Sequence, residues 1–146
     1  MEQQPRTLQL FDSGGAQFAV FLDEVMSISE SREPAVLLQA PASVLGVISI
    51  HGRMLTVLDL SQLLETQQRT ETTSHRLALN GDEQLALAIG KPGETTEISA
   101  VNSEEDPGSQ LVSRVIDRNG DEIKILNVKE LFPTAIQGRE RRRRRV

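Results

Sequence analysis

The stretch Val44-Leu-Gly-Val-Ile-Ser-Ile-His-Gly-Arg-Met-Leu-Thr-Val-Leu-Asp-Leu60 decides the fold of this chain. Its two runs of aliphatic and β-branched residues flank His51-Gly-Arg53, and apolar runs on either side of a glycine-containing turn are typical of a β-hairpin. Asp59 then stands as a helix N-cap ahead of Leu63-Leu64. The stretch therefore predicts a short helix after two antiparallel strands, residues 44–50 and 55–60.

Apolar runs flank a turn signal at three more places, so we expect a chain built mainly of hairpins. Each turn contains glycine, which adopts the positive φ that tight turns require. A second short helix is expected after the last hairpin, capped by Asn127 and ended by Pro133. The three further hairpins are residues 8–22 around Asp12-Ser-Gly-Gly15, residues 77–89 around Asn80-Gly81, and residues 112–126 around Asn119-Gly120.

The second and fourth hairpins repeat each other. Residues 44–64 align with residues 112–132 at a constant offset of 68, with six identities. The first and third hairpins align at an offset of 67, where Phe18-Ala-Val20 meets Leu85-Ala-Leu87. A repeat of this period predicts two like units rather than a solenoid. The alternative is that any two hairpin–helix segments look alike.

Composition limits what these units contain. Of the 146 residues, 38% are hydrophobic but only 3% are aromatic, so Val, Ile and Leu must fill the core. This length fits one domain or two small subdomains with a shared core. The absence of cysteine excludes disulfides and thiolate sites, and the N-terminal sequence lacks the features of a signal peptide. We therefore expect a soluble, cytoplasmic, all-β protein.

No pattern for catalysis or for a cofactor is found. His51 and His75 are the only histidines, one in a turn and one in a polar connector, so no metal site is expected. Ser49 lies within a predicted strand, without the sharp turn that exposes a hydrolase nucleophile. Gly90-Lys-Pro-Gly93 lacks the spacing of a phosphate loop, and residues 117–121 read as a hairpin turn rather than a calcium loop. These observations predict a binding protein without catalytic residues, cofactors or metals.

Charge divides the chain into two parts. Residues 139–146 hold six arginines and one glutamate, whereas residues 1–138 hold 10 basic and 20 acidic residues, a net charge of −10. We expect the basic segment to be a disordered, solvated tail. It could instead contact an anionic membrane surface through Arg141 to Arg145, or bind acidic partners or the acidic body itself. A peripheral membrane-binding or nucleic-acid-binding protein acting through this tail is the alternative function, although the acidic body makes nucleic acid an unexpected partner.

The second hairpin resembles the CheW-like domain family. Ala40-Pro41, then residues 44–52 and Leu55-Thr-Val-Leu-Asp-Leu60, match the family's proline, its Gly-Val-Ile-Asn-Leu-Arg-Gly type of strand and its Pro-Val-hydrophobic-Asp-Leu strand. The likeness extends over about residues 8–132. It implies an all-β fold of two SH3-like β-barrel subdomains packed together, with short helices. The expected division is a single domain, residues 1–138, with intertwined subdomains at roughly 8–65 and 77–132, followed by the tail.

The resemblance also implies a function. CheW-like domains are non-enzymatic adaptors that link the cytoplasmic tip of a methyl-accepting chemoreceptor to the regulatory domain of a CheA-type histidine kinase. Receptor helices lie against a groove between the barrels, and barrel ends meet kinase barrels within membrane-proximal receptor arrays. The chain departs from the family where Ser27 replaces an acid, where His51 replaces arginine beside Arg53, and at Gly90 to Gly93, which are expected to end a strand early.

Candidate partner-binding residues follow from the motif and from strand alternation. Alternation puts Ile48 and Ile50 on an inward face and Val47, Ser49 and His51 on the outward face. Residues near the family's receptor groove also read as ordinary core, and Gly46 also reads as a packing glycine. The expected partner-binding residues are Val25, Ser27, Ile28, Gly46, Ser49, His51 and Arg53.

Overall fold

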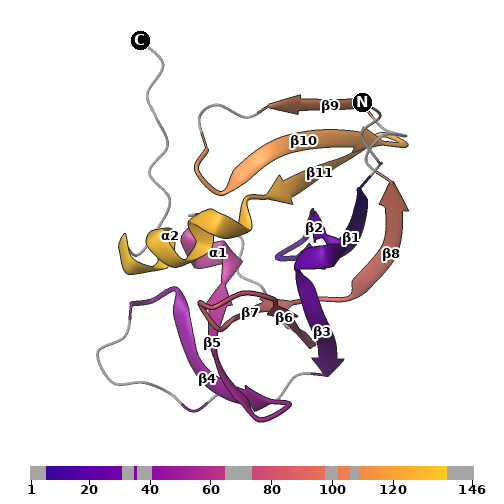
Figure 1. Ribbon diagram of the computed structural model, residues 1–146. Helices are drawn as coiled ribbons and strands as arrows, with labels where there is room; N and C mark the ends of the chain where they lie inside the picture. Colours follow the sequence, from indigo (N-terminus) through magenta and orange to yellow (C-terminus); the bar gives the residue numbers. More distant parts are fainter. Residues whose placement is uncertain are drawn as a thin grey trace, which may run out of the picture.

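Two β-sheets, with short helices where they meet, make up the fold. The computed structural model describes residues 6–30, 35, 41–64, 74–97, 102–105 and 109–137. In Figure 1 one sheet occupies the upper part of the molecule and the other the lower part. The elements are β1 (Thr7–Ser13), β2 (Ala16–Phe21), η1 (Leu22–Glu24), β3 (Val25–Glu30), β4 (Val44–Ile50), β5 (Arg53–Asp59), α1 (Leu60–Leu63), β6 (His75–Leu79), β7 (Leu85–Ile89), β8 (Pro92–Glu97), β9 (Asn102–Glu105), β10 (Val112–Arg118), β11 (Asp121–Leu126), η3 (Val128–Glu130) and α2 (Leu131–Gln137).

The two sheets exchange strands. The six-stranded sheet has the order β8-β1-β2-β11-β10-β9, and the five-stranded sheet has the order β3-β6-β7-β5-β4. After β1 and β2 the chain crosses to the other sheet at η1, which we call the first crossing. After β6 and β7 it crosses back at Gly90-Lys91, the second crossing. Each sheet therefore contains strands from both halves of the sequence, and the halves are interlocked.

The pairing registers confirm the predicted repeat. β11 runs parallel to β2 with Lys124 opposite Phe18, and β5 runs parallel to β7 with Thr56 opposite Leu85. These two pairs are related by the offsets of 68 and 67 seen in the sequence. The β4–β5 and β10–β11 pairings also shift register at equivalent places, between Val44 and Gly46 and between Val112 and Arg114. A bulge placed identically in two hairpins indicates a duplicated plan.

All four predicted hairpins are present. His51 and Gly52 both have positive φ, at 50° and 77°, and so do Asn119 and Gly120, at 55° and 86°. Two central residues of positive φ form the turn whose twist suits a hairpin, and Asn and His are among the few side chains that tolerate this conformation. His51 can therefore occupy this turn position, because histidine tolerates a positive φ. The family resemblance, in which His51 stands in place of an arginine, did not reveal this backbone requirement.

The strand predicted to end early ends at Ile89, just before Gly90. The close approach of Asp12 explains the glycine, because a Cβ on Gly90 would come within 2.0 Å of Asp12 Oδ1 and 3.1 Å of Asp12 O. The backbone nitrogen of Gly90 donates to Asp12 O at 2.8 Å, and that of Lys91 donates to Asp12 Oδ1 at 2.8 Å. The break between β7 and β8 is thus the second crossing, and β8 begins in the other sheet at Pro92.

Three hydrophobic clusters fill the molecule. Aliphatic residues dominate, as the composition predicts. One cluster lies within the six-stranded sheet, where Leu10, Ile116 and Ile123 are buried, and one within the five-stranded sheet, where Ile48 and Leu55 are buried. The largest cluster joins the two sheets with the buried faces of both helices, through Leu58, Leu60, Leu63, Leu77, Leu87, Leu126, Leu131 and Ala135 among others.

The two helices differ from each other at their caps. Asp59 caps α1 as expected, because its Oδ1 accepts a hydrogen bond from the backbone nitrogen of Ser61 at 3.0 Å. Asn127 stands at the equivalent place but makes no side-chain cap hydrogen bond. The prediction that Pro133 ends the second helix is wrong, since α2 runs from Leu131 to Gln137. Pro133 lies in the first turn, where a backbone N–H has no intrahelical acceptor, so proline removes nothing.

Candidate partner-binding surfaces

The first candidate surface is β3, an edge strand of the five-stranded sheet. Val25, Ser27 and Ile28 are all half-buried, and the two apolar side chains pack against the cluster between the sheets. The pairing with β6 shifts register between Val25 and Ser27. Ser27 Oγ is buried and has no hydrogen-bond partner within the described ranges. The two apolar side chains thus serve the core and leave part of their surface at a sheet edge.

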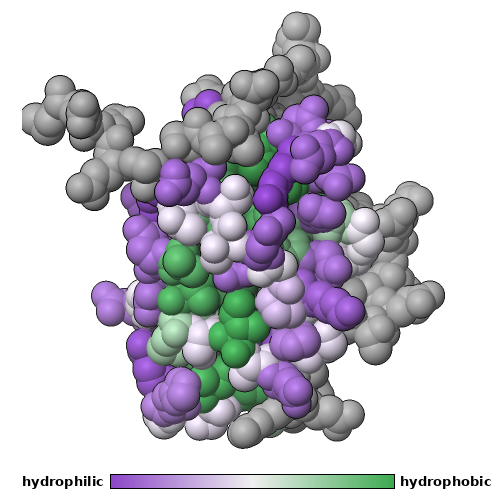
Figure 2. Space-filling model, turned by 90° about the vertical axis from the view of Figure 1, so that its right-hand side faces the viewer, coloured by the Kyte–Doolittle hydropathy of each residue, from purple (hydrophilic) through white to green (hydrophobic). Residues whose placement is uncertain are grey.

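Figure 2 shows the face on which β3 and β8 lie. Hydrophobic side chains gather in its middle, and polar side chains surround them on both sides. An apolar strip with a polar rim is the usual composition of a protein–protein contact.

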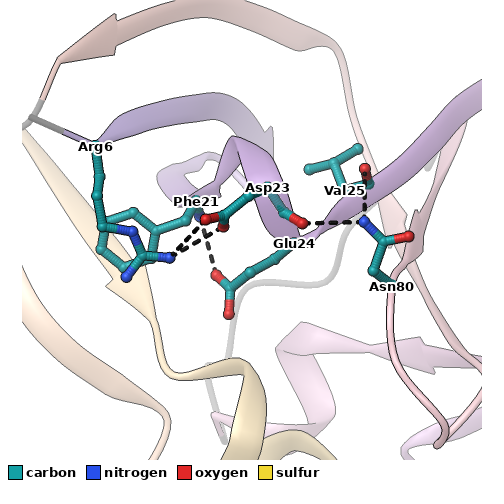
Figure 3. Close-up of polar contacts among 6 residues, drawn as sticks. All are labelled: Arg6, Phe21, Asp23, Glu24, Val25 and Asn80. Atoms are coloured by element: carbon teal, nitrogen blue, oxygen red, sulfur yellow. Dashed lines mark hydrogen bonds and ion pairs between the residues drawn. The ribbon is translucent and has the colours of Figure 1, made fainter. Parts of the chain in front are cut away.

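The first crossing fixes the start of β3 (Figure 3). Asn80 Nδ2 donates to the backbone oxygens of Asp23 at 3.0 Å and Val25 at 3.3 Å, and its backbone nitrogen donates to Glu24 O at 2.8 Å. Arg6 donates to the Asp23 carboxylate at 3.0 Å, and its guanidinium lies 3.5 Å from the centre of the Phe21 ring. These contacts tie the start of β3 to the β6–β7 turn through Asn80 and to the N-terminal segment through Arg6.

Glu24 is the titratable group of this crossing. Its Oε1 accepts a hydrogen bond from the backbone nitrogen of Phe21 at 3.1 Å. Burial nevertheless raises the pKa of Glu24 above its usual 4.5, against the opposing effects of that hydrogen bond and of the Arg6 and Lys129 charges. The crossing therefore holds a partly desolvated carboxyl group beside an apolar strip.

The second candidate surface is the end of the β4–β5 hairpin, where Ser49, His51 and Arg53 lie, while the fourth predicted residue of this hairpin, Gly46, lies in the bulge near the start of β4. Ser49 and His51 are exposed, as alternation predicts, and Ile48 is buried. Gly46 has a φ of 149° in the bulge, a conformation that favours glycine, so it has a structural reason to be there. Arg53 is half-buried and donates to Gly81 O at 3.3 Å, which ties this hairpin to the β6–β7 turn.

Sequence reasoning missed Met54, which is 58% exposed and lies opposite Ser49 on the same hairpin. Alternation from the buried Leu55 could have found it, because neighbouring strand residues face opposite sides. Leu22 in η1 was also missed and is 42% exposed. Met54 therefore adds exposed apolar surface to the end of the β4–β5 hairpin, and Leu22 adds exposed apolar surface next to β3.

The sheet order does not bring the two candidate surfaces into one strand pair. β3 and β4 are the opposite edges of the five-stranded sheet. Their inward side chains meet in one cluster, where Met26 of β3 joins Leu45 and Ile50 of β4. A partner bound at β3 and a partner bound at β4 would thus contact two strands that pack on the same hydrophobic cluster.

A third surface, at the end of the β10–β11 hairpin, has different chemistry. A cleft of about 310 Å³ lies between this hairpin and β8, and its lining includes Asp12, Lys91 and Asp121. Arg118 and Glu94 form an ion pair of 2.8 Å across it. Within the described ranges no group of three or more His, Asp or Glu side chains is arranged to hold a metal ion, and no helix has the length and hydrophobicity to span a membrane.

Comparison with known proteins agrees with this architecture. The chain is similar to the crystal structure of the scaffolding protein TtCheW from Thermoanaerobacter tengcongensis, with a TM-score of 0.73 and 14% sequence identity, over 85% of this chain and 90% of that chain. No curated protein matches by sequence. The model of the CheW-like domain matches residues 7–135. The chain therefore belongs to the CheW-like domain family, a family of chemotaxis scaffolds and adaptors rather than enzymes.

Proposed function

We propose that this protein is a non-enzymatic adaptor that couples a chemoreceptor to a CheA-type histidine kinase. The observation that carries the proposal is the match of the CheW-like domain over residues 7–135. The interlocked sheets support it, because strands exchanged in both directions prevent the two halves from moving apart without breaking β-pairing. A rigid body with several separate surfaces is suited to holding proteins in a fixed arrangement.

The β3 edge is the proposed receptor contact. Val25 and Ile28 offer apolar surface beside a clamped crossing, and Leu22 extends that surface. A receptor helix could lay an apolar face along such a strip, as amphipathic helices do in grooves. The acid that the family often has at Ser27 is absent, so the receptor is expected to lack the cation that would pair with it.

The end of the β4–β5 hairpin is the proposed kinase contact. Met54 is its large exposed apolar side chain, and Ser49, His51 and Arg53 supply polar groups around it. An apolar centre with a polar rim is the arrangement in which a few residues carry most of a binding free energy. These partners place the protein in the cytoplasm, at membrane-proximal receptor arrays.

Met54→Glu tests this assignment, because it puts a charge in the centre of the proposed contact without touching the core. We expect binding to the kinase regulatory domain to weaken at least about tenfold, with an unchanged melting temperature. Titration of the purified kinase domain by calorimetry measures the effect.

Glu122→Lys is the matched control, because Glu122 holds the equivalent position in the other hairpin. It should leave the kinase contact of the β4–β5 end intact. Equal losses in both variants would contradict the assignment of that end. Failure of the wild-type protein to bind either a receptor cytoplasmic tip or a kinase regulatory domain from its own cell would refute the proposed function.

A further inference from the structure

The turn between β6 and β7, residues 80–84, has a neighbour from each of the two proposed contacts; we call it the linking turn. In the five-stranded sheet β6 pairs with β3, and β7 pairs with β5. On one side the linking turn meets η1 and the start of β3, at the proposed receptor contact. On the other side it meets β5 near the end of the β4–β5 hairpin, the proposed kinase contact.

Three hydrogen bonds from Asn80 hold the receptor side of the linking turn. Its backbone nitrogen donates to Glu24 O at 2.8 Å. Its Nδ2 donates to Asp23 O at 3.0 Å and to Val25 O at 3.3 Å (Figure 3). All three acceptors are backbone oxygens of η1 and β3, so a displacement of the start of β3 changes the position of Asn80.

Two hydrogen bonds hold the kinase side of the linking turn. The half-buried Arg53 donates through Nη2 to Gly81 O at 3.3 Å. The backbone nitrogen of Thr56 donates to Gln84 O at 2.9 Å. Asn80 and Gly81 are consecutive residues, so the clamp on β3 and the acceptor of the Arg53 bond lie next to each other in the chain. Contiguous hydrogen bonds of this kind can carry coupling between two sites.

The linking turn also has room to shift. A cleft of about 220 Å³ lies beside it, lined by the turn itself and by Glu24, Val128 and Lys129 among others. Gln84 has a φ of 55°, a conformation that residues other than glycine rarely adopt and that persists only where the surroundings hold it. A change in the bonds at one end of the turn can therefore alter the other end, which a closely packed core would resist.

We propose that the linking turn couples the receptor contact to the kinase contact, with Asn80 as its positioning residue. A receptor helix on β3 fixes Val25 and with it Asn80, and Gly81 then holds Arg53 in the orientation that the kinase meets. Each partner therefore strengthens the binding of the other by the same factor. The inference rests on the proposed function for its partners, whereas the hydrogen bonds of the turn belong to the free protein.

The coupling is tested by calorimetric titration of the kinase regulatory domain into the free protein and into the protein saturated with a receptor cytoplasmic fragment. We expect the fragment to tighten kinase binding about fivefold. Asn80→Asp replaces a donor by an acceptor that faces two carbonyl oxygens, so the ratio of the two affinities should fall to about one. A purely structural role for Asn80 would lower the fraction of folded protein in both titrations and leave that ratio unchanged.

The link inside the turn is tested without any partner, by amide hydrogen exchange of the free protein. In Asn80→Asp the Thr56 amide should exchange about tenfold faster, because its acceptor belongs to the linking turn. The Asn127 amide, which donates to Leu111 O outside this sheet, should keep its rate and so excludes global destabilisation. Asn80→Ala removes the two side-chain bonds without adding a charge and should change the Thr56 rate in the same direction.

Asn119→Asp is the matched control, because it adds the same charge to an exposed Asn-Gly turn that belongs to neither proposed contact. It should keep both the wild-type affinity ratio and the wild-type exchange of Thr56. Unchanged Thr56 exchange in both Asn80 variants would overturn the link, and a wild-type affinity ratio of one would overturn the coupling. A wild type that binds neither partner would refute the proposed function and the coupling with it, while the exchange rates decide the link separately.

Discussion

The β4–β5 hairpin and the β10–β11 hairpin have the same backbone, but their ends carry opposite charge. Both contain the bulge, the turn of two positive φ residues and the parallel neighbour at equivalent positions. Residues 49–54 read Ser-Ile-His-Gly-Arg-Met, with one arginine and a charge of +1. Residues 117–122 read Asp-Arg-Asn-Gly-Asp-Glu, where three acids and one arginine give −2. Only the glycine that the turn requires is shared.

The two crossings differ in the same way. Asp12 clamps the second crossing, where its backbone nitrogen donates to Lys91 O and its carboxylate accepts from the backbone nitrogen of Lys91. Asn80 clamps the first crossing with a backbone donor to Glu24 O and an amide donor to Asp23 O. Positions that hold the backbone keep their role with different side chains, and positions that face solvent diverge. The two hairpin ends can therefore bind different partner proteins although their backbones are alike.

The largest change in unfolding free energy is expected from a substitution at the second crossing. Gly90→Ala places a methyl group against Asp12, which must move and lose its hydrogen bond to Lys91. Overpacking of this kind costs about 1–3 kcal/mol of unfolding free energy, measured by denaturant titration. Asp23 is the equivalent residue of the first crossing and has an exposed side chain, so Asp23→Ala should cost less than about 0.5 kcal/mol. Similar costs at both sites would contradict the different packing of the crossings.

The helix caps give a smaller effect. Asp59→Ala removes the hydrogen bond to Ser61 and should reduce the unfolding free energy by about 1 kcal/mol. Asn127→Ala removes no cap hydrogen bond and should cost less than about 0.5 kcal/mol. Thermal or denaturant unfolding of the two variants measures the difference. Equal losses would show that Asn127 caps its helix in solution.

How far the sequence could predict this molecule depends on the range of the interactions. Glycine turns and alternation are local, so the hairpins and the outward faces of Ser49 and His51 could be predicted. The repeat was visible because turns, caps and apolar positions recur together. The exchange of strands could not be predicted, because the pairing of β3 with β6 depends on contacts between residues 45 or more positions apart. Whether Val25 and Ile28 bind a partner stays a prediction, because half-buried side chains are compatible both with core packing and with partner binding.

The smallest effect concerns the pH dependence of the first crossing. Because burial raises the pKa of Glu24, the folded protein holds this proton more tightly than the unfolded chain does. The contribution of Glu24 to stability is thus fully present below pH 4.5 and is lost as pH rises through the folded-state pKa. Glu24→Gln keeps an acceptor for Phe21 without a charge, so it should melt slightly above the wild type at neutral pH and together with it in acid.

Lys91→Gln, at the equivalent place in the second crossing, is the control for this change. It should leave the profile of melting temperature against pH unchanged across the acid range, because that crossing holds no half-buried carboxyl group in the place of Glu24. Thermal melts at several pH values decide between the two outcomes. A Glu24→Gln protein less stable than the wild type at neutral pH would mean that the attraction of Arg6 and the hydrogen bond to Phe21 outweigh the cost of burial. The first crossing would then be held by charge, as the second is held by the Asp12 carboxylate.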